Sequence, residues 1–254
     1  MSAYGLVGVG AIAEAIVVGL SESDDPPALT LSPRSADISA ALAERYANVG
    51  IAADNQAVLD AAPVVLLCVR PQIARAVVSD LRFRDDHVVI SVMAGISIDE
   101  LERLIAPATD VCRCIPLPAV ARHSGVTPIH PPQPIARALF DRLGSAVEVP
   151  DIEAYDGFAV ASATMAAHFE FLRTVSGWLT RQGVAADDAS RYLAAVFAAL
   201  GDAVETSHDF AHLAREHATV GGINEHFQRT LTEAGVYDEV STALDAVLTR
   251  LRTL

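Results

Sequence analysis

Two glycines and an alanine near the N-terminus have the types and spacing of a phosphate-binding turn. Gly8, Gly10 and Ala13 form the pattern G-x-G-x-x-A between an apolar run and a helical pattern. The first glycine permits a tight turn, the second lets a phosphate approach the backbone, and the alanine lets helix and strand pack closely. We expect the amide groups of Gly8, Gly10, Ala11, Ile12 and Ala13 to bind a dinucleotide pyrophosphate. The alternative is a glycine-rich bend without a ligand.

A second group of polar residues lies where the next strand ends, the usual position of the adenosine ribose. NAD-binding proteins commonly carry Asp or Glu there, but the stretch LTLSPRS from Leu29 to Ser35 has no acid. Ser32, Arg34 and Ser35 offer hydroxyl and guanidinium groups that suit a 2′-phosphate. These residues favour NADP(H) over NAD(H), unless Arg34 is an ordinary solvated arginine.

Residues 1–150 alternate between short apolar runs and helical patterns, which indicates a parallel sheet covered by helices on both faces. The sequence therefore predicts a doubly wound α/β domain of the Rossmann type. The expected strands are Tyr4–Gly8, Leu29–Ser32, Val64–Val69, Val88–Met93, Val111–Ile115, Val126–Ile129 and Val147–Val149. The expected helices are Ala11–Leu20, Ala36–Tyr46, Asn55–Ala61, Ile73–Asp80, Ile98–Leu104 and Pro134–Leu143.

No strand pattern follows Pro150, so residues 151–254 are expected to form a separate all-helical domain. The expected helices are Asp151–Gly183, Asp187–Ser207, Asp209–His217, Ile223–Glu233 and Tyr237–Leu251. The middle of the first helix carries no charge apart from the ionisable His168. A helix that is apolar all round is usually buried, often against another subunit. We therefore expect a homodimer, with Phe169, Phe171 and Trp178 as core or dimer contacts.

Composition excludes several classes of function. The 254-residue chain has a formal net charge of −14, which argues against nucleic acid or an anionic membrane as a partner. All 18 basic residues are arginine, so the chain lacks the lysine of Schiff-base enzymes and P-loops. No uncharged apolar run reaches the roughly 18–20 residues of a membrane helix.

The cysteines and histidines carry weaker signals. Three cysteines and no signal peptide predict a reduced, cytoplasmic protein, with Cys112 and Cys114 sharing one face of a strand in the core. His208 and His212 have the spacing of metal ligands, but Asp209 has the type of a helix N-cap between them. We expect no metal site.

Five motifs together resemble the pyrroline-5-carboxylate reductase family over nearly the whole chain. They are GVGAIAEAIVVGL (8–20), LLCVRPQ (66–72), VVISVMAGIS (88–97), RCIPLPA (113–119) and TVGGINEHFQRTLTEAG (219–235). The resemblance implies a dinucleotide domain, a helical dimerisation domain and a composite active site. Members of the family transfer hydride from NAD(P)H to a cyclic imine, making proline.

The resemblance also implies roles for particular residues. Val69, Arg70 and Pro71 would lie along the ribose of the cofactor, and Ala94 and Gly95 near its nicotinamide. Thr219, Gly221, Gly222 and Asn224 would face the substrate. In the family, amides of the two glycines hold the substrate carboxylate and a following threonine bonds the imine nitrogen. Asn224 stands at that threonine's position.

Three substrate-side motifs depart from the family pattern. The family's PNTP is Pro116-Leu117-Pro118 here, and its paired threonines are Ile223 and Asn224. Its SGSGPAY becomes SATMAAH, which places Met165 in the substrate region and His168 at the tyrosine position. His168 is either a proton donor near neutral pH or a histidine packed at the subunit interface.

The sequence therefore predicts an NADPH-dependent reductase of the pyrroline-5-carboxylate reductase type, with Asn224, His168 and Thr219 as candidate catalytic residues. Gly221, Gly222, Asn224 and Met165 are the candidate substrate-binding residues. One alternative is a reductase or dehydrogenase of the same fold that acts on another small imine, keto acid or hydroxy acid. A second alternative is a dinucleotide-binding protein without catalysis.

Overall fold

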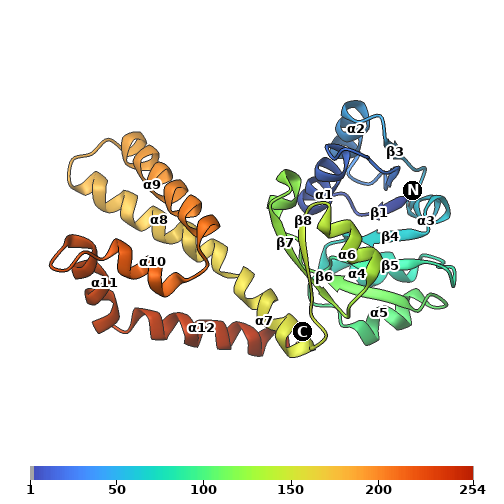
Figure 1. The fold of residues 1–254 in the computed structure, drawn as a ribbon. Coiled ribbons are helices and arrows are strands. Elements are labelled where there is room, and N and C mark those ends of the chain that lie inside the picture. The colour runs from blue at the N-terminus through green and yellow to red at the C-terminus, as the bar shows by residue number, and fades with distance from the viewer. Residues whose placement is uncertain (1–2, 254) are drawn as a thin grey trace. The chain divides into compact units, whose positions relative to one another are not determined.

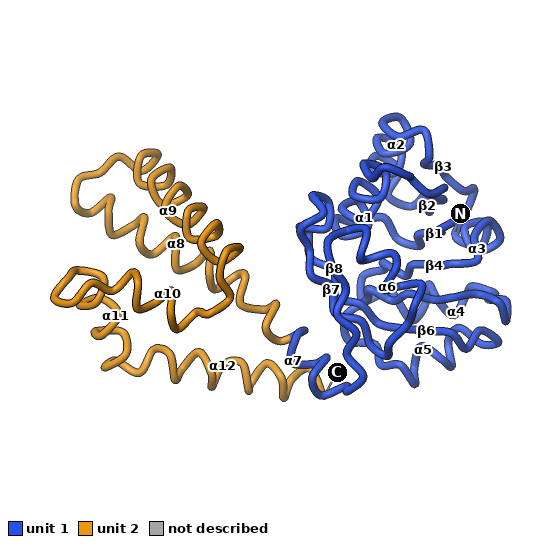
Figure 2. Tube along the Cα trace, viewed as in Figure 1, with its two compact units in different colours: residues 1–159, 254 blue, residues 160–253 orange. Residues whose placement is uncertain are grey.

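The computed structural model describes residues 3–253 and contains two compact units. Unit 1 extends to Ala159, and unit 2 runs from Val160 to Thr253 (Figure 2). Unit 1 is an α/β domain and unit 2 is all-helical (Figure 1). The predicted fold class, a doubly wound domain followed by a helical domain, is confirmed.

Unit 1 is built on an eight-stranded sheet with the order β3-β2-β1-β4-β5-β6-β7-β8. Neighbouring strands are parallel except for the antiparallel pair β6 and β7. The strands are β1 (Tyr4–Val7), β2 (Leu29–Leu31), β3 (Val49–Ile51), β4 (Val64–Leu67), β5 (Val88–Ser91), β6 (Asp110–Cys114), β7 (Gly125–His130) and β8 (Gly144–Glu148). Strand β3 was not predicted.

Alternate strand residues enter two different hydrophobic cores, because successive side chains of a strand point to opposite faces of the sheet. In β4, Val64 and Leu66 join the core that contains the helices α1 (Ala11–Ser21) and α6 (Pro134–Asp141). Val65 and Leu67 join the core that contains α3 (Asn55–Ala61), α4 (Pro71–Ser79) and α5 (Ile98–Ile105). Cys112 and Cys114 both lie in the first core with their sulfurs 3.9 Å apart, as expected for one strand face.

Seven helical segments connect the strands up to β8. They are α1 (Ala11–Ser21), α2 (Ala36–Arg45), α3 (Asn55–Ala61), α4 (Pro71–Ser79), α5 (Ile98–Ile105), the 3₁₀ helix η1 (Pro118–Arg122) and α6 (Pro134–Asp141). Several begin where a side chain satisfies a free amide. Asp54 accepts a hydrogen bond from the amide of Ala57, and Ser97 from the amide of Glu100.

The remaining helices are α7 (Ile152–Ser162), α8 (Thr164–Arg181), α9 (Ala186–Thr206), α10 (Phe210–His217), α11 (Ile223–Glu233) and α12 (Val236–Leu251). The single helix expected over Asp151–Gly183 is wrong, because a turn at Ala163 separates α7 from α8. The Ala163 amide bonds to the Val160 carbonyl at 2.9 Å, three residues back, and the Thr164 hydroxyl bonds to the Ala161 carbonyl. These two bonds reach carbonyls three residues back, in place of the four-residue spacing of a continuous α-helix.

The boundary between the units falls inside α7, at Ala159 and Val160, rather than at the expected residue 150. The first residues of α7 group with unit 1 because Tyr155 packs over β6 and β7. Its ring lies 5.5 Å from the His130 ring and 5.0 Å from the Arg113 guanidinium carbon.

Unit 2 buries very few side chains in the protomer. Within its described residues, only Val160, Ala189 and Leu193 are buried. Phe169, Phe171 and Trp178 are exposed, so they are not core residues within the protomer, and of their two expected roles the dimer contact stays a prediction. No helix within residues 3–253 combines the length and apolar character needed to cross a membrane.

Candidate functional site

A cavity of about 310 Å³ lies at the carboxyl ends of β1, β2 and β4. The chain runs from β1 to β2 and β3 on one side of β1, and then returns to β4 on its other side. Such a switch point is where open α/β sheets bind ligands. The cavity is lined by Val7, Gly8, Val9, Gly10, Ser32, Arg34, Ser35, Asn55, Cys68, Val69, Arg70, Ile73 and Val77.

The two glycines of the turn have different structural roles. Gly8 has φ +89°, and a Cβ there would lie 3.0 Å from the backbone of Cys68. Gly10 is the N-cap of α1, and a Cβ there would meet no atom within 4 Å. Gly8 therefore lets β1 and β4 approach each other, while Gly10 leaves open space beside the first amides of α1.

Ser32, the residue after β2, holds the glycine turn in place through a hydrogen bond. Its side chain is fully buried, and its hydroxyl accepts a 2.9 Å hydrogen bond from the Gly8 amide. The Ser39 hydroxyl donates to the Ser32 carbonyl at 3.0 Å. Ser32 thus fixes the glycine turn, which differs from the expected role as a free 2′-phosphate ligand.

The cavity is locally basic although the chain is strongly acidic. Arg34 follows β2 and Arg70 precedes α4, both are exposed, and both line the cavity. No carboxylate occurs among the described residues that line it. An anion entering the cavity would therefore meet two guanidinium groups and no acid, since opposite charges attract across a short distance.

Sequence reasoning missed Asn55 and Cys68. Asn55 is the first residue of α3. The sequence signal that could have identified it is the preceding Asp54, which caps this helix. Burial raises the pKa of the Cys68 thiol to about 12, so Cys68 lines the cavity as a neutral thiol. Of the other expected cofactor residues, Ala11, Ile12, Ala13, Pro71, Ala94 and Gly95 are not among those lining the cavity. Ala13 is buried in the hydrophobic core on which α1 packs, in agreement with its expected packing role.

Of the candidate substrate residues of unit 2, Thr219, Gly221 and Gly222 lie in the loop between α10 and α11, and Asn224 lies in the first turn of α11. The Asn224 amide donates to the His217 carbonyl at 3.0 Å, and the Gly222 amide to the Thr219 carbonyl at 2.8 Å. The Gly221 amide donates to the Glu225 carboxylate at 2.6 Å. The two glycine amides are therefore engaged within the protomer, contrary to the expectation of a free anion site.

His168 and Met165 lie on the exposed surface of α8. The His168 ring lies 5.4 Å from the Phe197 ring of α9, and Glu170 pairs with Arg173. Asp209 caps α10 through the His212 amide, as expected. The described residues contain no group of three His, Cys, Asp or Glu side chains suited to a metal ion.

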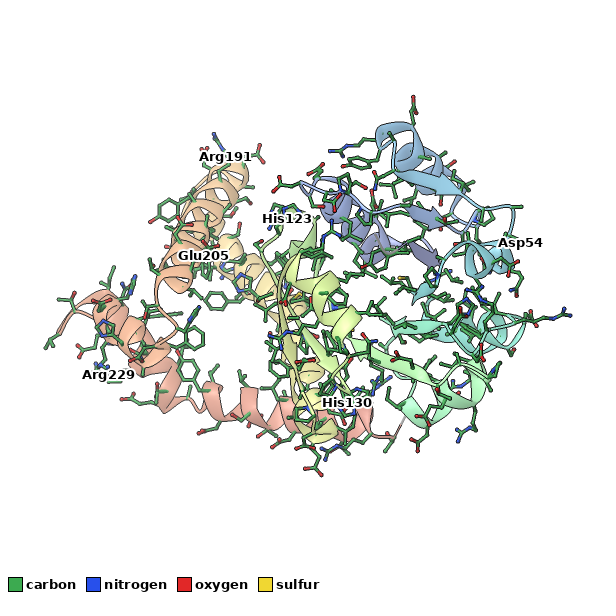
Figure 3. All side chains as sticks on the ribbon, turned by 45° about the vertical axis from the view of Figure 1, so that its right-hand side comes forward. Asp54, His123, His130, Arg191, Glu205 and Arg229 are labelled. Atoms are coloured by element: carbon green, nitrogen blue, oxygen red, sulfur yellow. The ribbon has the colours of Figure 1, made fainter. Side chains whose placement is uncertain are left out.

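Arg113 of β6 forms a further buried cluster that sequence reasoning did not identify. Its Nε atom is buried and has no hydrogen-bond partner among the described residues. Its cross-strand neighbour on β7 is His130, which is labelled in Figure 3. The His130 Nδ1 lies 2.8 Å from the Val149 carbonyl oxygen. Burial raises the pKa of Tyr155 well above its ordinary value, so the phenol that stacks on Arg113 stays protonated.

Two family models match the chain. The model described as "NADP oxidoreductase coenzyme F420-dependent" matches residues 3–95, and "Pyrroline-5-carboxylate reductase dimerisation" matches residues 155–254. The first segment carries the cavity-forming glycine turn, and the second carries the helices that follow Pro150.

Similar proteins extend over the whole chain. Pyrroline-5-carboxylate reductase 3 of Rattus norvegicus is 24% identical and covers 98% of this chain and 95% of its own. The Streptococcus pyogenes 1-pyrroline-5-carboxylate reductase structure has a TM-score of 0.82 at 23% identity, covering 100% of this chain and 99% of its own. The Plasmodium falciparum pyrroline carboxylate reductase structure with NADP bound has a TM-score of 0.80 at 15% identity, covering 99% and 97%. The dimerisation model and the curated relatives support the pyrroline-5-carboxylate reductase family for this chain, and the solved structures show that it has the same fold.

Proposed function

We propose that this protein is a reductase that transfers hydride from NADPH to the C=N bond of a cyclic imine. The observation that carries the proposal is the basic cavity at the switch point of unit 1, in a chain whose helical unit matches the dimerisation domain of imine reductases. The relatives in R. norvegicus and S. pyogenes are named pyrroline-5-carboxylate reductases.

The residues around the cavity suit a dinucleotide. The first amides of α1, with the open space at Gly10, would bind the pyrophosphate. Arg34, Ser35 and Asn55 would hold the adenosine ribose and its 2′-phosphate, which favours NADPH over NADH. The related P. falciparum structure contains NADP. Arg70, Val69 and Pro71 would lie farther along the cofactor, and Ala94 and Gly95 near the nicotinamide.

When bound, the cofactor supplies the hydride that reduces the imine carbon. The protein's contribution is to orient the substrate and to let the imine nitrogen take one proton, so that C=N becomes CH–NH and NADPH becomes NADP⁺. Asn224, Thr219 and His168 are the candidate polar groups on the substrate side. The protein would act as a homodimer through its helical unit.

The test is NADPH oxidation by the purified protein with pyrroline-5-carboxylate and with other cyclic imines, and with NADH in parallel. Turnover with any cyclic imine supports the proposal, and a drop in the Asn224→Ala variant assigns a role to that amide. Tight NADPH binding without turnover of any imine or carbonyl compound would instead indicate a dinucleotide-binding protein without catalysis.

A further inference from the structure

The cavity of unit 1 contains two guanidinium groups that are free to bind a ligand. Arg34 and Arg70 are exposed and line the same cavity, and no carboxylate occurs among the described residues that line it. Within residues 3–253, neither guanidinium forms an ion pair or a hydrogen bond. A phosphate monoester carries about −1.5 to −2 charges at pH 7. One guanidinium leaves part of that charge uncompensated, and the cavity can supply a second.

The helices that begin at the cavity also lack side-chain caps. Gly10, Ser35 and Arg70 are the N-caps of α1, α2 and α4, and each lines the cavity without a side-chain cap hydrogen bond. Side chains cap α3, α5 and α6 instead, and those cap residues are not among the described residues that line the cavity. The amides left open at the three helix starts favour a ligand with several negative charges.

The face of α4 that lines the cavity indicates which part of the cofactor lies beside Arg70. Ile73 and Val77 follow Arg70 by three and seven residues, the spacing of one helix face, and both line the cavity. They are apolar and half-buried, which suits the flat surface of an adenine ring. The volume of about 310 Å³ is near the lower end of the roughly 300–1,000 Å³ of small-molecule sites. It therefore suits the adenosine half of a dinucleotide.

We propose that Arg34 and Arg70 bind the 2′-phosphate of NADPH from two sides, and that Arg70 is a specificity-determining residue of the reductase. The assignment rests on the proposed function, in which this cavity binds NADPH. Arg34 follows β2 and Arg70 precedes α4, and β2 and β4 lie on opposite sides of β1. The backbone of residues 69–71 keeps its place farther along the cofactor, while the Arg70 side chain reaches back to the adenosine end. Its planar fork can bind two phosphate oxygens at once.

The alternative is that the Arg70 side chain follows its backbone toward the pyrophosphate or the nicotinamide ribose. NADPH and NADH share those groups and differ only in the 2′-phosphate, so their two affinities separate the alternatives. Arg70→Ala removes the guanidinium, and Arg70→Lys keeps one positive charge without the fork. Arg75→Gln is the matched control, because Arg75 lies on the same helix, pairs with Glu100 and is not among the residues that line the cavity.

The experiment measures the Kd of NADPH and of NADH by isothermal titration, in the unmodified protein and in each variant. We expect Arg70→Ala to weaken NADPH binding about tenfold or more and to leave NADH binding within about twofold. Arg70→Lys should cause a smaller loss, and Arg75→Gln should leave both affinities unchanged. When Arg34→Ala and Arg70→Ala are combined, NADPH should bind no more tightly than NADH, because both phosphate ligands are gone.

Adenosine 2′,5′-bisphosphate provides a second readout that needs neither nicotinamide nor imine. Because it carries the 2′-phosphate, Arg70→Ala should weaken its binding by the same factor as that of NADPH. An unchanged affinity for the bisphosphate, equal losses of NADPH and NADH, or no loss of either would overturn the proposal and leave the reductase function standing. Absence of NADPH binding to the unmodified protein would overturn both. A selective loss of NADPH in protein that turns over no imine would overturn only the reductase function.

Discussion

Gly8 and Gly10 lie in one turn but differ in what an added methyl group would meet. Gly8 has a positive φ, and backbone atoms lie 3.0 Å from where its Cβ would stand, whereas the space at Gly10 is empty. We expect Gly8→Ala to lower the free energy of unfolding by about 1–2 kcal/mol or more. Gly10→Ala should change it by less than about 1 kcal/mol but weaken NADPH binding, because the methyl group fills the phosphate approach. Urea denaturation and NADPH titration would measure both, and equal effects of the two substitutions on stability would contradict the assignment.

Arg34 is the residue on which the preference for NADPH depends. It lines the cavity after β2, where no acid is present. Arg34→Ala should weaken NADPH binding about tenfold or more, because a charge-assisted bond to phosphate is lost, and leave NADH binding nearly unchanged. Isothermal titration with each cofactor checks this, with Arg45→Ala on α2, which pairs with Glu22, as the control. Equal losses for both cofactors would remove Arg34 from the 2′-phosphate.

Arg113 is a buried cation whose only described side-chain partner is the Tyr155 ring. A cation–π contact provides about 0.5–2 kcal/mol, while desolvating an unpaired charge costs several kcal/mol. We therefore expect Arg113→Met, which keeps most of the volume, to leave the free energy of unfolding unchanged or higher. Arg113→Ala should lower it by leaving a cavity. Thermal denaturation compares the two, and an equal loss in both would show that the charge itself stabilises the fold.

At the scale of elements, the sequence predicts regular segments well and subtle interruptions poorly. Ile223–Glu233 and Asn55–Ala61 have the predicted bounds, because cap residues and apolar spacing mark their ends. Strand β3 is only three residues long and contains Gly50, so it has no detectable pattern. The turn at Ala163 has neither proline nor glycine to signal it.

The candidate site likewise contains residues that the sequence predicts and residues that it misses. The glycine turn and Arg34 are predictable because a parallel sheet brings the ends of β1 and β2 to one edge. Asn55 and Cys68 were missed because their place in the cavity depends on how α3 and β4 pack against that edge. The bond from Gly221 to Glu225 depends on a positive φ, which sequence spacing does not reveal.

The end of α3 and the start of β5 are joined by His87, which makes this connection sensitive to pH. Nδ1 of His87 accepts the Arg84 amide and Nε2 donates to the Leu59 carbonyl, each at 3.0 Å. Burial, and then the charge of Arg84, lower the pKa of His87, against opposing effects of the Leu59 carbonyl, Asp86 and Asp60. Between this lowered value and the ordinary value near 6.5, the unfolded chain binds more protons, so stability falls as pH falls.

Removing this histidine should flatten the pH dependence of stability. The loss in free energy of unfolding between about pH 7.5 and about pH 5.5 should be smaller in His87→Gln than in the unmodified protein. Chemical denaturation at the two pH values measures the difference. His208→Gln, at an exposed position, is the control and should keep the full loss. An unchanged loss in His87→Gln would show that other groups titrate in this window.

At the scale of the whole molecule, unit 2 is the part that a single protomer does not explain. It spans more than ninety residues, yet its described side chains include only three buried ones, Val160, Ala189 and Leu193. Phe169, Tyr192 and Trp178 are 68%, 64% and 53% exposed. Exposed apolar surface of this extent marks a protein interface, and an obligate interface resembles a domain core divided in two.

We therefore expect unit 2 to be stable only in a homodimer. Trp178 is the chain's single tryptophan, so its fluorescence reports on this surface: the emission maximum should be that of a buried indole in the dimer and shift to longer wavelength on dilution. Phe169→Glu should place a charge in the interface and weaken dimerisation at least about tenfold. The shift of the emission maximum to longer wavelength should then occur at a higher protein concentration than in the unmodified protein. Light scattering on the same samples gives the mass, with Glu170→Gln, the exposed neighbour on α8, as control. A monomer at micromolar concentration with native thermal stability would contradict the expectation, because the helical unit would then hold its fold without a partner.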